Sequence, residues 1–444
     1  MSLLSINTGV AAVLAHSKSF GIISENISNS GTVGYKKIEA DFKAVGTSTG
    51  GKQNSGGVLA KHDFNANSQG SSKISSSNTD LAIIGNGMFV VNPSATPGNN
   101  DPYLMTRVGS FVVGEDGKMK NSDGLYLQAW RTDAAGAIVN AGTQTTLPSL
   151  ETVSLGPELD NGAATENLVL GANLPADVAA GATENTAQTI YDSKGNAYGL
   201  QVNWVKGATA NTWDYTFALI SNPFGAPSEQ KFTPVGTSRT MLFDPNGALK
   251  GIGPKGGAPT IGLPAERSTE TLTISAAQFA ANDPGRNVDP SSITIDWGSY
   301  SRVSSGMSQV ASPYRPWRLQ ADGFPPASRD GVTVTDDGLV QVQYKNGRTK
   351  NVYRIPLANV RAPTELERVV GNAYTITNTS GDLTLNAAKR GGNGAIQGGQ
   401  LENSTVDMAK EFAQLIVTQK SYNTATRIIT TTDEMLQAVT GLKR

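Results

Sequence analysis

The chain has 444 residues, with 36 Lys and Arg against 37 Asp and Glu, two His and no Cys. This charge balance excludes the basic excess with which proteins bind nucleic acid or anionic membranes. The absence of Cys excludes disulfides, thiol catalysis and Cys-based metal centres. The length allows about two to four domains, and the 49 Gly residues, set among many Ser, Thr and Asn, favour strands and turns over helical bundles.

The N-terminal segment is predicted to form a helix. Ser5 can serve as its N-cap, and apolar residues recur at a spacing of seven until Asn29, Gly31 and Gly34 interrupt the pattern. The segment has neither a basic region nor a continuous apolar stretch, so we expect no cleavable signal peptide. No part of the chain approaches the ~18 apolar residues of a membrane span. The heptad positions are Ile6, Val13, Phe20 and Ile27.

The interior is predicted to be β-rich. Residues 81–84 and 88–91 form two strand-like runs around an Asn-Gly turn, and residues 108–120 read as a second hairpin. Regular turn spacing of this kind predicts antiparallel sandwiches or barrels. Further turns separate strand-like runs at 191–195, 243–247, 336–338 and 345–347.

The C-terminal segment is predicted to form a longer helix. Ser404, with Asp407 three residues later, resembles a capping box. The apolar residues that follow repeat at a spacing of seven, which is typical of a coiled-coil seam. These positions are Met408, Leu415, Tyr422, Ile429 and Leu436.

Heptads at both ends of the chain indicate two helices that share one coiled seam. Two amphipathic helices packed separately on a globular core remain the alternative. Burial of a large apolar side chain stabilises by roughly 1.5–3 kcal/mol, whereas ordering one backbone residue costs about 1–2 kcal/mol. So few apolar positions cannot order the helices alone, and we expect the ends to fold on assembly.

The sequence contains no pattern typical of a catalytic site or of a cofactor-binding site. His16 lies on the predicted helix, where a solvated or interface side chain is expected, and no metal-ligand spacing surrounds His62. The Gly-rich residues 391–399 read as a linker, and Asp336 and Asp337 belong to a turn. We therefore expect no enzyme, no cofactor and no metal site.

Four motifs in chain order resemble the bacterial flagellar rod and hook axial proteins. Residues 26–37 (NISNSGTVGYKK) resemble the segment that ends the family's first helix. Residues 80–91 and 106–111 resemble its first strand pair and its T-R-x-G-x-F hairpin, and residues 399–436 resemble its closing helix. The matching residues that we single out are Asn26, Asn29, Gly34, Tyr35, Gly85, Gly87, Arg107, Gly109 and Phe111.

Within this family the middle of the chain favours a hook subunit. Residues 189–214 and 319–326 look like an outer hook domain, whereas rod proteins lack so large an insertion. The resemblance implies a structural subunit that self-assembles into a curved, flexible tube, a universal joint that transmits torque from rod to filament. A distal rod subunit and a secreted β-rich binding module are the alternatives.

The resemblance also implies partners and a location. The chain would form a homopolymer and contact other flagellar axial proteins, namely the distal rod and the hook–filament junction. It would also meet the hook cap and the type III export machinery, with no nucleic acid and no membrane insertion. We expect it outside the cell, in the flagellar basal body and hook, exported without a cleavable signal peptide.

The expected fold is mainly β with α-helical termini that pair as a coiled coil. The terminal helical domain, or inner tube, takes residues 1–72 and 398–444. A discontinuous β domain, the middle shell, takes residues 73–150 and 304–397. An inserted domain of the sandwich or barrel type, the outer shell, takes residues 151–303.

Overall fold

The computed structural model divides the chain into two compact units. The first comprises residues 1–157, 330–343 and 348–444, and the second comprises residues 158–329 and 344–347. The second unit is therefore an insertion in the sequence of the first. The structure describes residues 2–49, 52–64, 66, 68–98, 101–139, 146–156, 159–221, 223–225, 230–264, 266–284, 288–304 and 306–441.

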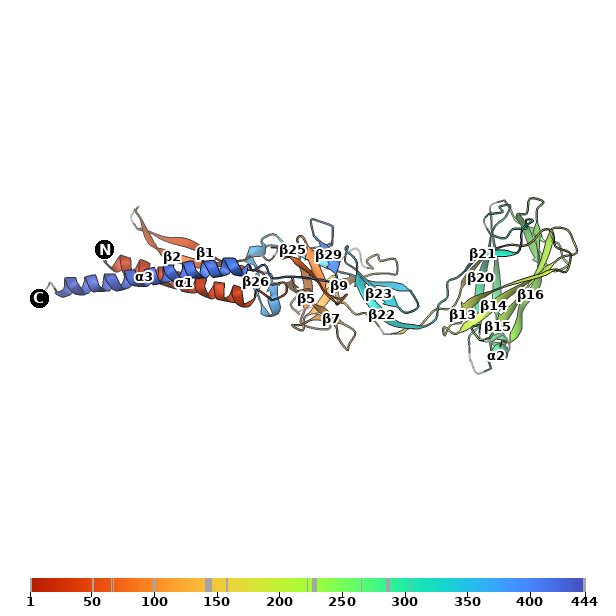
Figure 1. The fold of residues 1–444 in the computed structure, drawn as a ribbon, viewed down its shortest axis with the longest axis horizontal. Coiled ribbons are helices and arrows are strands. Elements are labelled where there is room, and N and C mark those ends of the chain that lie inside the picture. Colours follow the sequence, from red (N-terminus) through yellow and green to blue (C-terminus); the bar gives the residue numbers. More distant parts are fainter. Residues whose placement is uncertain are drawn as a thin grey trace. The chain divides into compact units, whose positions relative to one another are not determined.

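The two ends of the chain form helices that lie side by side in the first unit (Figure 1). Helix α1 spans Ser2–Ser28 and α3 spans Met408–Gly441. They run antiparallel, because Gly9 adjoins Ile429 whereas Asn26 contacts Glu411. The hairpin of β1 (Ile38–Thr49) and β2 (Lys52–Phe64) also packs on α1. The predicted pairing of the terminal helices is confirmed.

Both helices begin at positions other than the predicted ones. Helix α1 already includes Ser2, so Ser5 is not its N-cap. The carboxylate of Asp407 accepts hydrogen bonds from two backbone N–H groups of the first turn of α3, which makes Asp407 the cap. The predicted capping box at Ser404 is wrong, because the helix begins only at Met408. Before it, the backbone N–H of Thr405 donates to the carbonyl of Tyr35, and the Thr405 hydroxyl accepts from the backbone N–H of Lys37.

The β body of the first unit is assembled from both halves of the chain. One sheet runs in the order β23-β24-β9-β5-β6-β27-β26, and smaller ladders pair β4 with β29, β3 with β30 and β25 with β28. The discontinuous β domain is confirmed, since strands from before and after the insertion share one sheet. Its core packs Met88, Met105, Trp130, Tyr374 and Leu385 together.

The strands of this body are short. They are β3 (Ser72–Ile74), β4 (Leu81–Ile84), β5 (Phe89–Asn92), β6 (Leu104–Thr106), β7 (Phe111–Val113), β8 (Met119–Asn121), β9 (Tyr126–Arg131), β10 (Glu151–Thr152), β22 (Ala327–Val334), β23 (Leu339–Tyr344), β24 (Thr349–Arg354), β25 (Pro356–Val360), β26 (Glu367–Arg368), β27 (Ala373–Thr375), β28 (Leu383–Ala387), β29 (Ala395–Gly398) and β30 (Gln400–Glu402). Short 3-10 turns cover Leu147–Ser149, Pro363–Glu365 and Val370–Asn372.

The predicted hairpins have mixed outcomes. Antiparallel pairs β7–β8, β13–β14, β16–β17 and β23–β24 confirm four of them. The pair predicted around the Asn-Gly turn at 86–87 is wrong, because β4 pairs with β29 whereas β5 pairs with β6 and β9. The backbone of Asn86 instead accepts a hydrogen bond from Gly394, which directs the two strands to different partners.

The second unit is a β-sandwich. One sheet carries β13 to β18 in sequential order, and the other has the order β19-β20-β12-β21. Both sheets contribute to one core, in which the ring of Trp297 lies 5.7 Å from Trp204 and 5.2 Å from Tyr215, measured between centroids. The expected sandwich is confirmed.

Most strands of this unit are longer than those of the β body. Its elements are β11 (Leu159–Asp160), β12 (Asn167–Asn173), β13 (Thr183–Tyr191), β14 (Ala197–Lys206), β15 (Thr212–Ile220), β16 (Phe232–Phe243), β17 (Leu249–Pro254), β18 (Thr260–Ile261), β19 (Arg267–Ile274), α2 (Ala276–Asn282), β20 (Ser291–Ser299) and β21 (Arg315–Ala321). The expected inserted domain ended at residue 303, but the unit extends to 329, because β21 pairs with β12.

Replacement of Trp297 by Ala is expected to destabilise the second unit. The side chain is fully buried, and removal of a core Trp costs about 3–5 kcal/mol. Urea unfolding followed by near-UV circular dichroism measures the loss. The control is Trp317→Ala, at a side chain that is 45% exposed, where we expect about 1 kcal/mol or less. Equal losses for the two variants would contradict the assignment of the core.

Candidate assembly site at the helix-to-sheet junction

The predicted heptad residues of α3 lie along its contact with α1 but are not its most buried positions. Leu415, Ile429 and Leu436 are half-buried, whereas Met408 is 46% and Tyr422 40% exposed. A second set of residues, also spaced by seven, is fully buried. It consists of Glu411, Thr418 and Ala425.

In helix α1, too, the most buried residues are not the predicted heptad residues. Ile6, Val13 and Ile27 are half-buried, and Phe20 is 44% exposed. Phe20 and Tyr422 line a pocket of about 240 Å³, together with Ser17 of α1 and Gln419 of α3. The fully buried positions of α1 are Gly9, Ala15, Ser19, Ile22, Ile23 and Asn26.

Small side chains set the spacing of this helix pair. A Cβ atom on Gly9 would lie only 3.0 Å from Cγ1 of Ile429. The absence of a side chain at Gly9 therefore lets Ile429 pack against the backbone of α1. Ser19 in α1 and Thr418 with Ala425 in α3 are buried as well. The sequence analysis overlooked these positions because it followed large apolar residues only. In α3 the available signal was Thr418 and Ala425, two small residues seven positions apart.

Asn26 ties the end of α1 to the chain that follows it. Its side-chain amide donates to the carbonyl of Ile38 at 2.8 Å and to Glu411 of α3 at 3.1 Å. Its carbonyl oxygen accepts from the backbone N–H of Ile38 at 3.0 Å and from the hydroxyl of Tyr35 at 3.1 Å. The amide therefore uses donors and acceptor together, and it fixes α1, β1 and α3 at one point.

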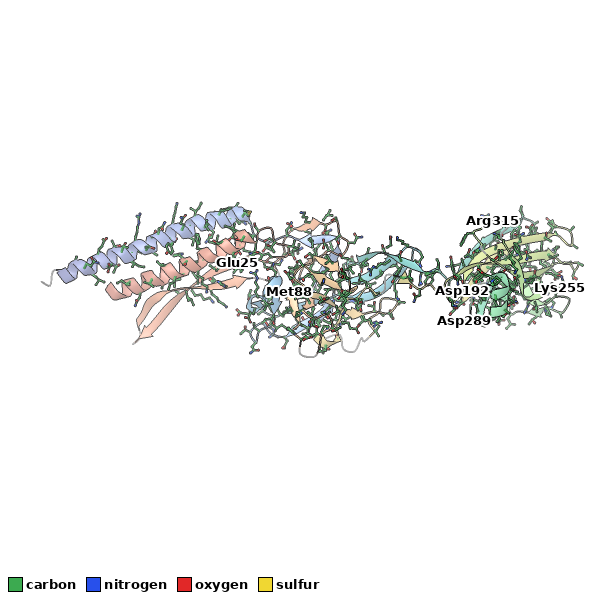
Figure 2. All side chains as sticks on the ribbon, turned by 90° about the horizontal axis from the view of Figure 1, so that it is seen from below. Glu25, Met88, Asp192, Lys255, Asp289 and Arg315 are labelled. Atoms are coloured by element: carbon green, nitrogen blue, oxygen red, sulfur yellow. The ribbon has the colours of Figure 1, made fainter. Side chains whose placement is uncertain are left out.

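Asn29 and Glu25 complete the end of α1. The Asn29 amide donates to the carbonyl of Glu25 at 2.9 Å, and its oxygen accepts from the hydroxyl of Thr32 at 3.1 Å. The Glu25 carboxylate lies 2.7 Å from Arg368, whose guanidinium also stacks over the ring of Tyr35 at 5.0 Å. Figure 2 shows Glu25 at the end of α1 that adjoins the β body.

A buried cluster of charges joins the β body to the residues that follow α1. The carboxylate of Glu402 in β30 lies 2.7 Å from Nζ of Lys36 and 3.4 Å from Nη1 of Arg107. It also accepts from the backbone N–H of Gly70 at 2.7 Å, and Arg107 donates to the carbonyl of Gly85 at 2.8 Å. All three charged side chains are almost fully buried. One carboxylate thus compensates two cations out of water.

Burial changes the titration of these groups. It lowers the pKa of Lys36 to about 8, since desolvation and the nearby Arg107 outweigh the attraction of Glu402. Burial likewise raises the pKa of Tyr35 to about 12, with Glu25 adding to the effect, so its hydroxyl stays a donor. Although burial opposes it, hydrogen bonds to Glu411 and Glu39 raise the pKa of Lys37.

Two glycines of the family motif are required by close backbone contacts. A Cβ on Gly109 would lie 1.7 Å from the carbonyl oxygen of Leu81, a distance too short for any residue other than glycine at this position. Gly34 has a φ of +68° and lies against the backbone of Arg107, where a Cβ would be 2.9 Å away. Together they let the chain after α1 lie directly on the β body.

The remaining motif residues lie in the same part of the β body. Gly87 approaches the side chain of Leu357, and Gly85 supplies the carbonyl that Arg107 binds. Phe111 packs edge-to-face on Phe89, with 5.7 Å between ring centroids. The structure thus gathers Asn26, Asn29, Gly34, Tyr35, Gly85, Arg107 and Gly109 around one junction.

The sequence analysis missed three residues of this junction. Glu402, Lys36 and Glu411 lie inside the segments that resemble the family, but none was selected. No local sequence feature sets them apart from neighbouring charged residues such as Lys37 and Lys410. Among the residues that the structure describes, no three or more His, Cys, Asp or Glu side chains gather as metal ligands would. In the same residues, no helix has the length and apolar character needed to cross a membrane.

Replacement of Glu402 by Gln is expected to weaken the junction strongly. Removal of one partner from a buried ion pair costs about 3–5 kcal/mol, because the remaining charges are left buried without compensation. The control, Glu365→Gln, breaks an exposed pair with Lys61, where about 0–1 kcal/mol is expected. Urea unfolding of both variants gives the comparison, and similar losses would contradict the role of Glu402.

The Lys36 pKa predicts a pH dependence of stability. The ordinary pKa of a lysine is 10.5, so between about pH 8 and pH 10.5 Lys36 has lost its proton in the folded chain but keeps it in the unfolded chain. Unfolding then takes up a proton, so a rise in pH stabilises the fold, by at most about 1.4 kcal/mol per pH unit. The difference in free energy of unfolding between the parent and Lys36→Met should therefore rise over this range. A difference that stays flat or falls would contradict the lowered pKa.

Comparison with known proteins identifies the family. The model described as the flagellar basal body protein FlaE D2 domain matches residues 158–324, which nearly coincide with the second unit. The model described as the flagellar basal body rod FlgEFG protein C-terminal matches residues 397–442, which include Glu402 and α3.

Relatives match over almost the full length. The flagellar hook protein FlgE of Rhizobium meliloti (strain 1021) is 30% identical over 445 residues and covers 99% of both chains. The protein of the same name from Brucella suis biovar 1 (strain 1330) is 32% identical, covering 99% of this chain and 98% of its own. The crystal structure of Helicobacter pylori flagellar hook protein FlgE2 aligns with 73% of this chain and 99% of its own, at 12% identity and with a TM-score of 0.49.

These matches do not favour a distal rod subunit or a secreted binding module. Identity of 30% or more extends over both helices, the β body and the sandwich. The chain therefore belongs to the flagellar hook protein family and is a structural subunit of the hook.

Proposed function

We propose that this chain polymerises into a curved, flexible tube that acts as a universal joint between the flagellar rod and filament. The observation that supports this most directly is the apolar surface that the single chain leaves uncovered. Several large apolar side chains of α3 are exposed, and extended apolar surface of this kind marks an interaction site. They are Met408, Phe412, Ile416, Val417, Ile428 and Met435.

Neighbouring copies would cover this surface. Helix α3 contacts α1 along one side only, so most of its circumference faces solvent in the single chain. A helix with apolar residues on more than one side is suited to burial between several neighbours. The expectation that α1 and α3 order on assembly stays a prediction, and strong amide protection in a verified monomer would contradict it.

The junction suits the transmission of torque. Asn26 and Glu402 connect the helices to the β body through buried, charge-assisted hydrogen bonds rather than through a flexible linker. Rotation applied to the helical part would therefore be passed to the β body of the same subunit. In this proposal, flexibility of the tube comes from contacts between subunits.

The second unit carries a surface suited to exchangeable contacts. The exposed face of β19 is rich in threonine, with Thr269, Thr271 and Thr273 facing outward. Exposed polar contacts contribute little each, about 0–1 kcal/mol. Neighbours could then change position on such a surface at small energetic cost as the tube bends.

The proposed layers follow the expected three domains. The helices would form the inner tube, the discontinuous β domain the middle shell and the inserted domain the outer shell. Further partners are the distal rod, the hook–filament junction, the hook cap and the type III export machinery, with the chain exported without a cleavable signal peptide to its place outside the cell. We assign it no catalytic role, because the relatives are structural proteins.

Negative-stain electron microscopy of the concentrated protein tests this function. We expect short curved tubes from the full chain. A chain truncated after Asp407 loses α3 but keeps Glu402, and it should form no tubes while the sandwich keeps its unfolding transition. Straight rods would favour a rod subunit, and separate particles under all conditions would contradict polymerisation. Tubes from the truncated chain would contradict the role of α3.

A further inference from the structure

We propose that a groove between α1, β1 and α3 receives part of α3 from a second copy of this chain. The inference rests on the proposed polymerisation and names the two surfaces that meet. One surface is concave and is called the groove. The other, called the ridge, consists of Met408, Phe412 and Ile416.

The groove has an apolar floor and a charged rim. Its volume is about 460 Å³, and Ile22, Ile23, Ile38 and Val417 supply its apolar lining. Nζ of Lys37 lies 3.2 Å from Glu39 at the rim and 3.0 Å from the buried Glu411, and Lys410 lines the groove as well. Because two lysines balance two glutamates, the entrance favours an uncharged apolar occupant over a strongly acidic or basic one.

The ridge supplies such an occupant. Phe412 is 47% and Ile416 53% exposed, and they are four residues apart, so they project from one face of α3. With about 100° between successive residues, that face is turned by roughly 150° from the one on which Ala413, Gln414 and Val417 line the groove. The ridge of a chain therefore cannot enter the groove of the same chain.

The dimensions of the two surfaces agree. The groove follows α3 from Lys410 to Val417, which at 1.5 Å per residue is about 10 Å. The ridge extends from Met408 to Ile416, about 12 Å by the same measure. A concave and a convex surface on different sides of one chain make a head-to-tail contact, which continues from copy to copy instead of closing as a dimer.

Engineered cysteines test this contact in the full chain, which has no Cys of its own. Ala40 of β1 lines the groove, so a chain carrying Ala40→Cys and Ile416→Cys should form a ladder of disulfide-linked multimers when its tubes are oxidised. The matched control carries Ala40→Cys and Thr424→Cys, an exposed position two turns further along α3. We expect at least tenfold less multimer from the control.

The outcomes separate the two proposals. Tubes that form without a ladder from the 40/416 pair would overturn the contact and leave polymerisation intact. Equal ladders from both pairs would overturn it too. Absence of tubes from the parent chain would refute polymerisation itself, and the contact with it.

A second variant covers the case in which the cysteines prevent assembly. Ile416→Asp should raise the critical concentration for tube formation at least tenfold, whereas Asn423→Asp, the same added charge at an exposed polar position, should change it less than twofold. Because Ile416→Asp keeps an intact groove, small amounts of it should also stop growth of parent tubes. An unchanged critical concentration for Ile416→Asp would overturn the contact.

Discussion

A single buried carboxylate, that of Glu402, joins the β body of the first unit to the segment that follows α1. Its partners Lys36 and Arg107 come from the segment after α1 and from the loop after β6, between 295 and 366 residues away in the chain. Two buried cations and one buried anion are stable only if they lie close together and if further hydrogen bonds replace those lost to water. The hydrogen bonds from Gly70 to Glu402 and from Arg107 to Gly85 are of this kind. The geometry of the junction is therefore narrowly defined.

That junction decides where the terminal helices start and how they pair. Thr405 is hydrogen-bonded to Tyr35 and Lys37, and α3 begins only after this contact, with Asp407 as its cap. Asn26 then joins the end of α1 to Glu411 in the first turn of α3. From this point the helices pack through small residues, which bring their backbones close but bury little apolar surface. The large apolar side chains of α3 are left for contacts with other copies.

The second unit depends on a different interaction. Its sandwich is held by an apolar core around three buried tryptophans, Trp204, Trp213 and Trp297, and no charged residue of the junction belongs to this core. Buried charge connects the helices to the β body, apolar burial builds the cores of the β body and of the sandwich, and exposed apolar surface remains on α3 for assembly.

The sequence by itself determined the class of fold, the presence of both terminal helices, most hairpins and the family. These depend on local patterns: turns at 191–195 and 243–247, heptads in α3, and motifs within short segments. Tertiary structure alone decided which strands pair around Asn86, where α3 begins, and which face of each helix is buried. Glu402 shows the reason most clearly. Its role depends on two cations hundreds of residues away, and no local pattern records which distant side chains will meet.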